Sequence, residues 1–247
     1  MDLVTRMKEE RLANVRAIYY TTQVQMAYNS NKIEGSRLSA EQTQHLFDTG
    51  QLIAKSEEVI RADDIIEAIN HFKAFDFILD TVYEPLSSDY IKDLHAIIKQ
   101  STSDTTSSVA VVGDFKKYPN VIGVVGEIQT TPPEDVEKEM KQLNDDYESI
   151  TKQQTLETIT DYHVSFEKIH PFSDGNGRVG RLIIFKECLR HDVTPFILLE
   201  QHRNYYYQGL QEYYNLGKER LLETFGASQD SYKVFLEKMG FVCRTSL

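Results

Sequence analysis

The sequence predicts a single, mainly helical domain, a helical bundle that carries one short β-hairpin. Apolar side chains recur at intervals of three and four residues over most of the 247 residues, which is the spacing of amphipathic helices. Only residues 109–128 are rich in β-branched side chains instead, and a lone hairpin is stable only when it lies on a larger structure. The sequence contains neither an internal repeat nor a linker longer than a loop, so we expect one compact unit.

The expected helices follow from apolar stripes and from capping residues. A first helix carries an apolar stripe at positions 12, 15, 19, 22 and 26. Ser39 and Gln42 form a capping-box pattern that predicts the start of the next helix. A long helix then runs from Asp63 to about Val82, before Pro85. Further helices are expected over about 88–98, from Pro132-Pro133, over 156–169, after Gly177, and in two stretches beyond Pro195.

Residues 101–129 interrupt the helical pattern. Seven of the eight residues from 101 to 108 are Ser or Thr, which indicates an exposed loop. The valines and isoleucines that follow, arranged around Pro119-Asn120, predict one hairpin over 109–129.

The amino-acid composition limits the classes of partner that the protein is expected to bind. The chain has 27 Lys and Arg against 38 Asp and Glu, a formal net charge of −11. Binding to nucleic acid or to anionic membranes needs a basic face, so we expect neither. The sequence has no apolar run near the roughly 20 residues of a spanning helix, and its first residues are charged, so we expect a cytoplasmic protein. Cys188 and Cys243 are too few for a disulfide framework.

The segment HPFSDGNGRVGR at 170–181 concentrates reactive side chains between two helical stripes. Gly-Asn-Gly at 175–177 opens a helix, where free N–H groups and the helix dipole favour an anion. Arg178 and Arg181 are three residues apart, on one face of the first turn, and guanidinium groups suit phosphate oxygens. The segment therefore predicts a phosphate-binding site.

Two further residues of this segment point to chemistry on the bound phosphates. Asp174 supplies a hard oxygen ligand, and Mg²⁺ is usually held by one or two carboxylates together with substrate phosphates. His170 has an ordinary pKa near 6.5 and can act as a general base.

The segment also bears some similarity to two other ligand-binding loops and to a plain turn. The glycines at 175, 177 and 180 fit a dinucleotide fingerprint, but that pattern needs a preceding strand, and an amphipathic helix precedes them. A calcium loop would need a Glu at its twelfth position, which is absent here. A plain helix-connecting turn with incidental charges stays open as the structural alternative.

Residues 170–181 match the signature of the Fic family, HxFx(D/E)GNGRxxR, at every defined position, so the chain resembles that family. The resemblance implies a Fic fold and an adenylyltransferase that moves AMP from ATP to a Ser, Thr or Tyr hydroxyl of a protein. It implies that His170 deprotonates the hydroxyl and that Asp174 holds Mg²⁺. It also implies that the phosphates are bound by Gly175, Asn176, Gly177, Arg178 and Arg181.

Two other segments extend the resemblance. The hairpin, with Gly113-Asp114-Phe115-Lys116 before it, is similar to the family's flap, which covers the nucleotide and pairs with the target as an added strand. The flap residues expected at this place are Val124, Val125 and Gly126. Residues 203–210 are similar to the adenine-side helix, so Tyr206 and Tyr207 are candidates for contacting the base or ribose, with simple packing as the alternative.

An N-terminal segment resembles the family's inhibitory motif, [ST]xxxE[GN]. It runs from Ser30 through Glu34 to Gly35. The resemblance implies that Glu34 pairs with Arg181 and removes the partner that the γ-phosphate needs, while Ser30, one helical turn earlier, fixes the helix that presents it. We therefore divide the chain into an N-terminal helical region, a Fic core with the flap and the signature, and a C-terminal helical extension. Their expected bounds are 1–80, 81–192 and 193–247.

The sequence thus predicts an autoinhibited, Mg²⁺-dependent protein adenylyltransferase whose partners are ATP and a target protein. Within the enzyme class, the alternative is a Fic protein that removes AMP or transfers another phosphate-containing group. Outside it, the alternative is a regulator that senses ATP without modifying anything, through self-association. The intact His170 argues against this regulator, because a site that only binds needs no base. Self-modification and a homo-oligomer stay open.

Overall fold

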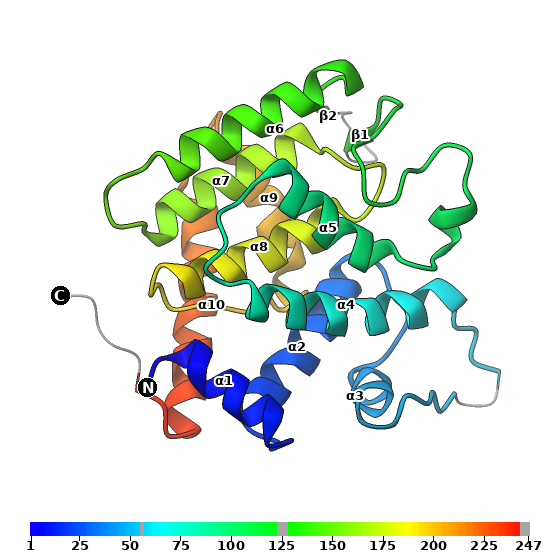
Figure 1. Ribbon diagram of the computed structural model, residues 1–247, viewed down its shortest axis with the longest axis vertical. Helices are drawn as coiled ribbons and strands as arrows, with labels where there is room; N and C mark the ends of the chain where they lie inside the picture. The colour runs from blue at the N-terminus through cyan, green and yellow to red at the C-terminus, as the bar shows by residue number, and fades with distance from the viewer. Residues whose placement is uncertain (55–56, 123–127, 243–247) are drawn as a thin grey trace.

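The computed structural model describes residues 1–54, 57–122 and 128–242, and their elements confirm a mainly helical protein (Figure 1). The first half contains α1 (Leu3–Leu12), α2 (Ile18–Ile33), α3 (Ala40–Thr49), α4 (Ala62–Asp80), α5 (Ser88–Lys99) and the 3-10 helix η1 (Ser103–Thr106). Two short strands follow, β1 (Val121–Ile122) and β2 (Ile128–Gln129). The second half contains α6 (Pro133–Glu148), α7 (Leu156–Ile169), α8 (Asn176–Arg190), the 3-10 helix η2 (Glu200–His202), α9 (Arg203–Glu212) and α10 (Glu219–Lys238).

Several helix starts lie where their capping residues place them. Ser39 accepts a hydrogen bond from the backbone N–H of Gln42, and the Gln42 side chain accepts one from the backbone of Ser39, so the expected capping box at α3 is confirmed. Ser87 caps α5 in the same way. Pro133 is the first residue of α6, and acidic residues follow it at the positive end of the helix.

The first apolar stripe belongs to two helices and not to one, so that expectation is wrong. α1 ends at Leu12 and α2 begins only at Ile18. Between them Asn14 has a φ of 52°, a left-handed conformation that terminates a helix. Leu12 is therefore turned to solvent, with 84% of its surface exposed, whereas Met26 further along the stripe is buried.

The hairpin expected over 109–129 is also wrong in its extent. Among the described residues, antiparallel pairing joins β1 and β2 alone, with Val121 opposite Gln129. The preceding residues, 107–120, have no strand structure. Two of their groups bond to the signature segment instead: the N–H of Lys116 donates to the carbonyl of Pro171, and the Asn120 side chain donates to the carbonyl of Phe172. The flap residues at 124–126 lie outside the described residues.

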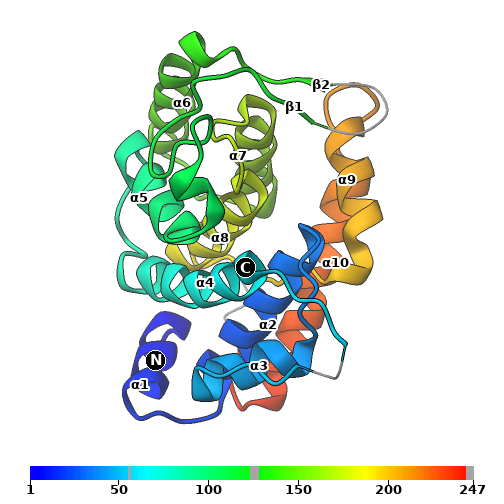
Figure 2. The ribbon, with the colours of Figure 1, turned by 90° about the vertical axis from the view of Figure 1, so that its right-hand side faces the viewer.

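Helix α8 lies inside the bundle, packed against α2, α4, α5 and α7 (Figures 1 and 2). Nearly all of its side chains are buried, as expected for a helix that is enclosed on every side. One buried apolar cluster joins residues of all three predicted regions, for example Phe75, Phe185 and Tyr232. The start of α8, where the signature segment ends, is thereby fixed near the centre of the molecule. None of the described helices is long and apolar enough to cross a membrane.

Truncation of the core at Phe75 tests this packing. Phe75 is fully buried, with its ring centroid 6.3 Å from that of Tyr19 and 5.4 Å from that of Phe185. We expect Phe75→Ala to lower the free energy of unfolding by about 3–5 kcal/mol, because it leaves a cavity that the neighbouring helices cannot close. Urea denaturation measures the loss. The control Leu12→Ala removes an exposed side chain and should change stability by less than about 0.5 kcal/mol; equal effects would contradict the assignment of the core.

Candidate functional site

The signature segment forms a tight loop between α7 and α8. His170 ends α7 in a left-handed conformation, with φ 51° and ψ 61°. Gly175 precedes α8 with a φ of 83°, a value that side chains disfavour. Inside the loop the ring of Phe172 is buried and stacks on the ring of His95 with centroids 3.8 Å apart, and Nε2 of His95 lies 3.1 Å from the carbonyl oxygen of Asp174. The loop is thus held from α5 as well as from its own ends.

Asn176 holds the loop from within. Its Oδ1 accepts a hydrogen bond from the N–H of Phe172 at 2.9 Å, and its Nδ2 donates to the carbonyl of Phe172 at 2.8 Å. The side chain is buried. The structure therefore gives Asn176 a role in shaping the loop, and its contact with a phosphate stays a prediction.

Arg178 and Arg181 diverge, although both were expected to face the phosphates together. The guanidinium of Arg178 points to α4 and to the loop, with Nη1 2.5 Å from Glu67 and Nη2 3.0 Å from Asp174. That of Arg181 points to α2. The two residues are 3% and 5% exposed, so both cations lie inside the protein.

Asp174 stands in a cluster of charges. Its Oδ2 accepts from both Lys99, at 2.6 Å, and Arg178. Partial burial favours a higher pKa for Asp174, but Arg178 and Lys99 outweigh it and hold the pKa of this carboxyl well below its usual range. About half of the side chain is exposed, so a ligand can reach it. Among the described residues no group of three or more His, Cys, Asp and Glu side chains is arranged to hold a metal ion.

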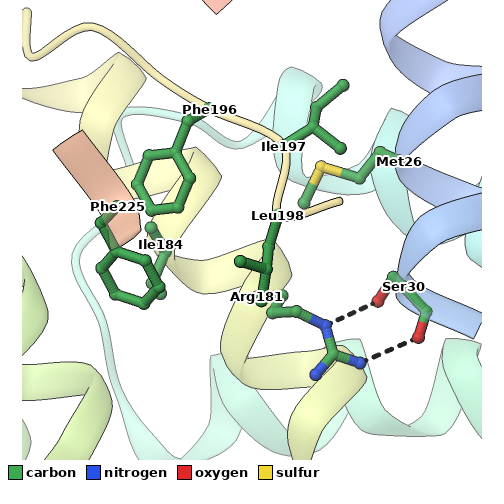
Figure 3. Close-up of a pocket in the computed structure, with 8 residues that line it drawn as sticks. All are labelled: Met26, Ser30, Arg181, Ile184, Phe196, Ile197, Leu198 and Phe225. Carbon is green, nitrogen blue, oxygen red and sulfur yellow. Dashed lines mark hydrogen bonds between the residues drawn. The ribbon is translucent and has the colours of Figure 1, made fainter. Parts of the chain in front are cut away.

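Ser30 and Glu34 meet Arg181 where α2 ends. Nε of Arg181 donates to Oγ of Ser30 and Nη2 donates to its carbonyl, both at 3.0 Å (Figure 3). Nη2 also donates to Oε1 of Glu34 at 2.7 Å. A side chain at Gly177 would collide with this carboxylate, so Glu34 lies over the first turn of α8. Gly35, with a φ of 91°, then turns the chain away from the site.

An apolar layer supports the contact between α2 and α8. Beside Ser30 and Arg181 lies a cavity of about 10 Å³, room for no more than one water molecule (Figure 3). It is lined by Met26, Ile184, Phe196, Ile197, Leu198 and Phe225. The aliphatic part of Arg181 therefore packs against apolar side chains, while its guanidinium is held by polar groups.

The surroundings of His170 favour the neutral imidazole. Burial, with a further contribution from the charge of Lys116, lowers the pKa of His170 to about 4. Lys116 is itself buried and donates to Asn120, Thr130 and the carbonyl of Ile169. It therefore joins the base of the β1–β2 pair to the residue that precedes His170.

The two tyrosines of the C-terminal region have different surroundings. Tyr206 is almost completely buried, and its hydroxyl lies 2.8 Å from Nε2 of His163. Its ring packs against Tyr207 and Phe225. Tyr206 therefore packs in the interior of the protein, as the alternative interpretation expected. Contact with a nucleotide stays a prediction for both tyrosines. Tyr207 is only partly buried, so it is the more accessible of the two.

Three charged residues of this site were missed by sequence reasoning: Glu67, Lys99 and Glu167. Glu67 and Lys99 belong to helices far from 170–181 in the sequence, and no local pattern pairs them with Arg178 and Asp174. Glu167 did leave a signal, because it lies among apolar positions of α7 with histidines four residues before and three residues after it.

Comparison with known proteins agrees with the signature. The model of the Fic/DOC family matches residues 85–187. The protein adenylyltransferase Fic of Nematostella vectensis is 27% identical over 195 residues, which are 76% of this chain and 42% of the relative. That of Aedes aegypti is 28% identical over 199 residues, 76% of this chain and 36% of the relative. The chain thus spans about two fifths of the length of the curated relatives that it matches.

Solved structures share the fold over nearly the whole chain. A Fic domain-containing signaling protein from Bacteroides thetaiotaomicron aligns with a TM-score of 0.75 and 18% identity, over 99% of both chains. Fic-1 from Caenorhabditis elegans, residues 134–508, aligns with a TM-score of 0.73 and 22% identity, over 91% of this chain and 65% of the other. The resemblance inferred from the signature is therefore confirmed.

The buried histidines predict how stability depends on pH. Burial lowers the pKa of His71 and His163 to about 3 and that of His95 and His170 to about 4. In the unfolded chain they bind protons near pH 6.5, so below that pH the unfolded state takes up more protons. Glu167, whose pKa burial raises to about 8, has the opposite effect, but it is one group against four. We expect the free energy of unfolding to fall by a few kcal/mol between pH 7 and pH 5.

Urea denaturation at pH 7, 6 and 5 measures this change. Above pH 5 the carboxyl groups whose pKa is lowered in the folded state contribute little, because they are ionised in both states. A stability that is constant or rises toward pH 5 would contradict the burial of these imidazoles.

Proposed function

We propose that this chain, which contains a Fic domain, transfers AMP from ATP to a Ser, Thr or Tyr hydroxyl of a target protein or of itself, and that Glu34 inhibits the transfer. The observation that carries the proposal is the contact of Glu34 with Arg181 over the first turn of α8. The names of the matching relatives, protein adenylyltransferase Fic, support AMP as the transferred group.

The start of α8 is suited to phosphate. The positive end of the helix dipole and the N–H groups of its first turn are available to an anion. Nη1 of Arg181 and Nε of Arg178 are buried without a hydrogen-bond partner in the described part of the chain. A buried donor without a partner costs about 1–3 kcal/mol, so an anionic ligand that approaches these groups would recover that energy.

The chemistry assigned to His170 requires a neutral imidazole. Its lowered pKa leaves it unprotonated at pH 7, with a nitrogen lone pair that can accept a proton. In the proposed reaction the proton of the target hydroxyl passes to His170 while the hydroxyl oxygen bonds to the α-phosphorus. The bond from the α-phosphorus to the bridging oxygen breaks, and pyrophosphate leaves.

Asp174 fits a Mg²⁺ ion that is held mainly by substrate. It is a half-exposed carboxylate beside the anion site, and proteins commonly bind this ion through one or two carboxylates together with phosphate oxygens. When bound, the ion would supply neutralisation of the phosphate charge. Lys99 and Arg178, which share Oδ2 of Asp174, keep this carboxyl ionised and fixed in place.

Inhibition follows from competition for one guanidinium. Glu34 uses Nη2 of Arg181, which the terminal phosphate of ATP would otherwise use. With that donor occupied, ATP binds in a pose whose α-phosphorus is not aligned with the target hydroxyl, and a misplacement of about 1 Å can cost two orders of magnitude in rate.

Substitution of Glu34 tests the inhibition. We expect Glu34→Gly to raise AMP transfer by at least about tenfold, because Arg181 becomes free for the terminal phosphate. We expect the additional change His170→Ala to abolish the transfer. Incorporation of radiolabelled AMP, with mass spectrometry of the +AMP adduct in a cell lysate, measures both and identifies the target.

A matched control distinguishes release of the site from a general change of the protein. Glu9→Gly makes the same substitution at an exposed position of α1 and should leave the transfer at the wild-type level. Equal labelling by the wild type and Glu34→Gly would refute inhibition by Glu34.

The position of Glu34 favours a second candidate function, the removal of AMP from a modified protein. About a third of its side chain is exposed, and it lies at the anion site, where a carboxylate can orient a water molecule. Incubation of a pre-AMPylated protein with the wild type and with Glu34→Ala separates the two functions. Transfer as the main function predicts no AMP release by either protein; release that requires Glu34 would make hydrolysis the main activity.

A further inference from the structure

The carboxyl group of Glu167 lies between two histidines on one face of α7. Its Oε2 is 3.9 Å from Nδ1 of His170, and its Oε1 is 3.9 Å from Nε2 of His163. Glu167 is 9% exposed. Its Oε1 and the Nδ1 of His170 are both buried without a hydrogen-bond partner among the described residues. The unpartnered Nδ1 of His170 thus faces Oε2 of Glu167 across a gap that a small side-chain rotation would close to a hydrogen bond, while the unpartnered Oε1 lies on the side of His163.

The neighbouring helix, α8, leaves space for the carboxyl group of Glu167. Gly180 lies on α8, and a Cβ atom there would come within 2.8 Å of Oε1 of Glu167 and within 2.9 Å of His163. Glycine inside a helix costs about 0.5–1 kcal/mol relative to alanine. The close approach of α8 to the Glu167–His163 pair explains why glycine is required at this position.

We propose that Glu167 is a positioning residue for His170: its carboxyl group faces Nδ1 of the imidazole and fixes the ring so that Nε2 faces the target hydroxyl. The inference rests on the proposed function, in which His170 is the base. Nothing in the family signature includes Glu167, which precedes the signature by three residues.

The arrangement determines which nitrogen of His170 carries the proton. A neutral imidazole has one N–H, and a carboxyl oxygen beside Nδ1 favours the form in which Nδ1 is protonated and Nε2 is free. When Nε2 accepts the proton of the hydroxyl, the ring becomes positively charged, and the ionised form of Glu167 stabilises that charge. The proton on Nδ1 stays there throughout. Glu167 therefore contacts neither substrate nor nucleotide and acts only through His170.

The groups that face Glu167 connect it to Glu34. Besides the two histidines of α7, these are Arg181 from α8, Glu34 from α2 and Tyr206 from α9. Burial raises the pKa of Glu167 to about 8, Arg181 opposes this rise and Glu34 adds to it. Withdrawal of Glu34 removes a nearby negative charge and so favours the carboxylate form of Glu167. Glu34, which occupies the phosphate site, therefore also disfavours the ionised form of Glu167, and this is the form that supports His170 as a base.

The surroundings of His170 contain charges of both signs. Lys116 lowers the pKa of His170, whereas the backbone of Glu167, which Glu167→Gln keeps, and the charges of Glu34 and Asp174 raise it. Lys116 and Asp174 stay in place when Glu167 is substituted, so a change in the titration of His170 between two variants of the same background reports on Glu167.

The experiment compares Glu167→Gln with an otherwise identical protein, both carrying Glu34→Gly. NMR of labelled histidine follows the tautomer and the titration of His170 without any turnover. We expect the pKa of His170 to fall by about 1 in Glu167→Gln, because the amide, unlike the carboxyl group, cannot ionise when the imidazole becomes charged. We also expect kcat for AMP transfer to fall about tenfold, with KM for ATP within about twofold, and the acid limb of the pH–rate profile to move with the pKa of His170.

Two further variants keep the test decisive. Glu157→Gln makes the same change at an exposed position of α7 and should leave the titration of His170 unchanged. Glu167→Asp keeps the carboxylate on a shorter side chain and should give intermediate values if the amide variant does not fold.

The outcomes separate this inference from the proposed function. An unchanged tautomer and pKa of His170 in Glu167→Gln would overturn the inference, even if activity falls, because a merely structural role predicts that result. If His170 responds as expected but Glu34→Gly transfers no AMP, the positioning of His170 stands and the proposed function fails.

Discussion

The fold has to neutralise one buried cation, the guanidinium of Arg181. Arg181 is 5% exposed at the centre of the bundle, on a helix enclosed by α2, α4, α5 and α7. A guanidinium at such a depth is tolerated only when it is neutralised and hydrogen-bonded. Ser30 and Glu34, at the end of α2, supply the opposite charge and three of the hydrogen bonds. The contact that satisfies Arg181 therefore also fixes the N-terminal region against the signature helix, so the proposed inhibition needs no separate device.

The same constraint reconciles the overall charge with an anion site. The chain has a formal net charge of −11, yet the cations around 170–181 are buried and not on the surface. Arg178 and Lys99 share the carboxylates of Glu67 and Asp174, and Lys116 is held by neutral oxygens next to His170. Each of these cations is 3% exposed. These cations are thus gathered in a small interior region, where the low dielectric strengthens their interactions with charged groups.

The sequence predicted those parts of the fold and of the site that depend on local residue patterns. The capping box at Ser39, the glycine turn before α8 and the motif of Ser30 and Glu34 all depend on residues within one or two turns of each other. The predictions failed where tertiary contacts override local preference. The valine-rich stretch before β1 has the composition of a strand, but the N–H groups of Val109 and Ala110 donate to Ser107. Lys116 and Asn120, further along, donate to the signature loop.

Other contacts had no local signal at all. Lys99 and Asp174 are separated by 75 residues, and only the packing of α5 against α8 brings them together. The sequence shows Glu167 as a charged residue on an apolar helix face. Its role cannot be inferred from that pattern, because the room for its carboxyl group depends on Gly180 of the neighbouring helix.

The most direct test of the central claim compares the affinities of ATP and ADP, since only ATP has the terminal phosphate that competes with Glu34 for Arg181. Calorimetry of the wild type and of Glu34→Gly gives the Kd of each nucleotide without depending on any target protein. The account predicts that ATP and ADP bind the wild type within about threefold of each other. In Glu34→Gly, ATP should bind at least about tenfold more tightly than ADP, since a charge-assisted hydrogen bond contributes about 1.5–3 kcal/mol. The same ratio of the two Kd values in both proteins would contradict it.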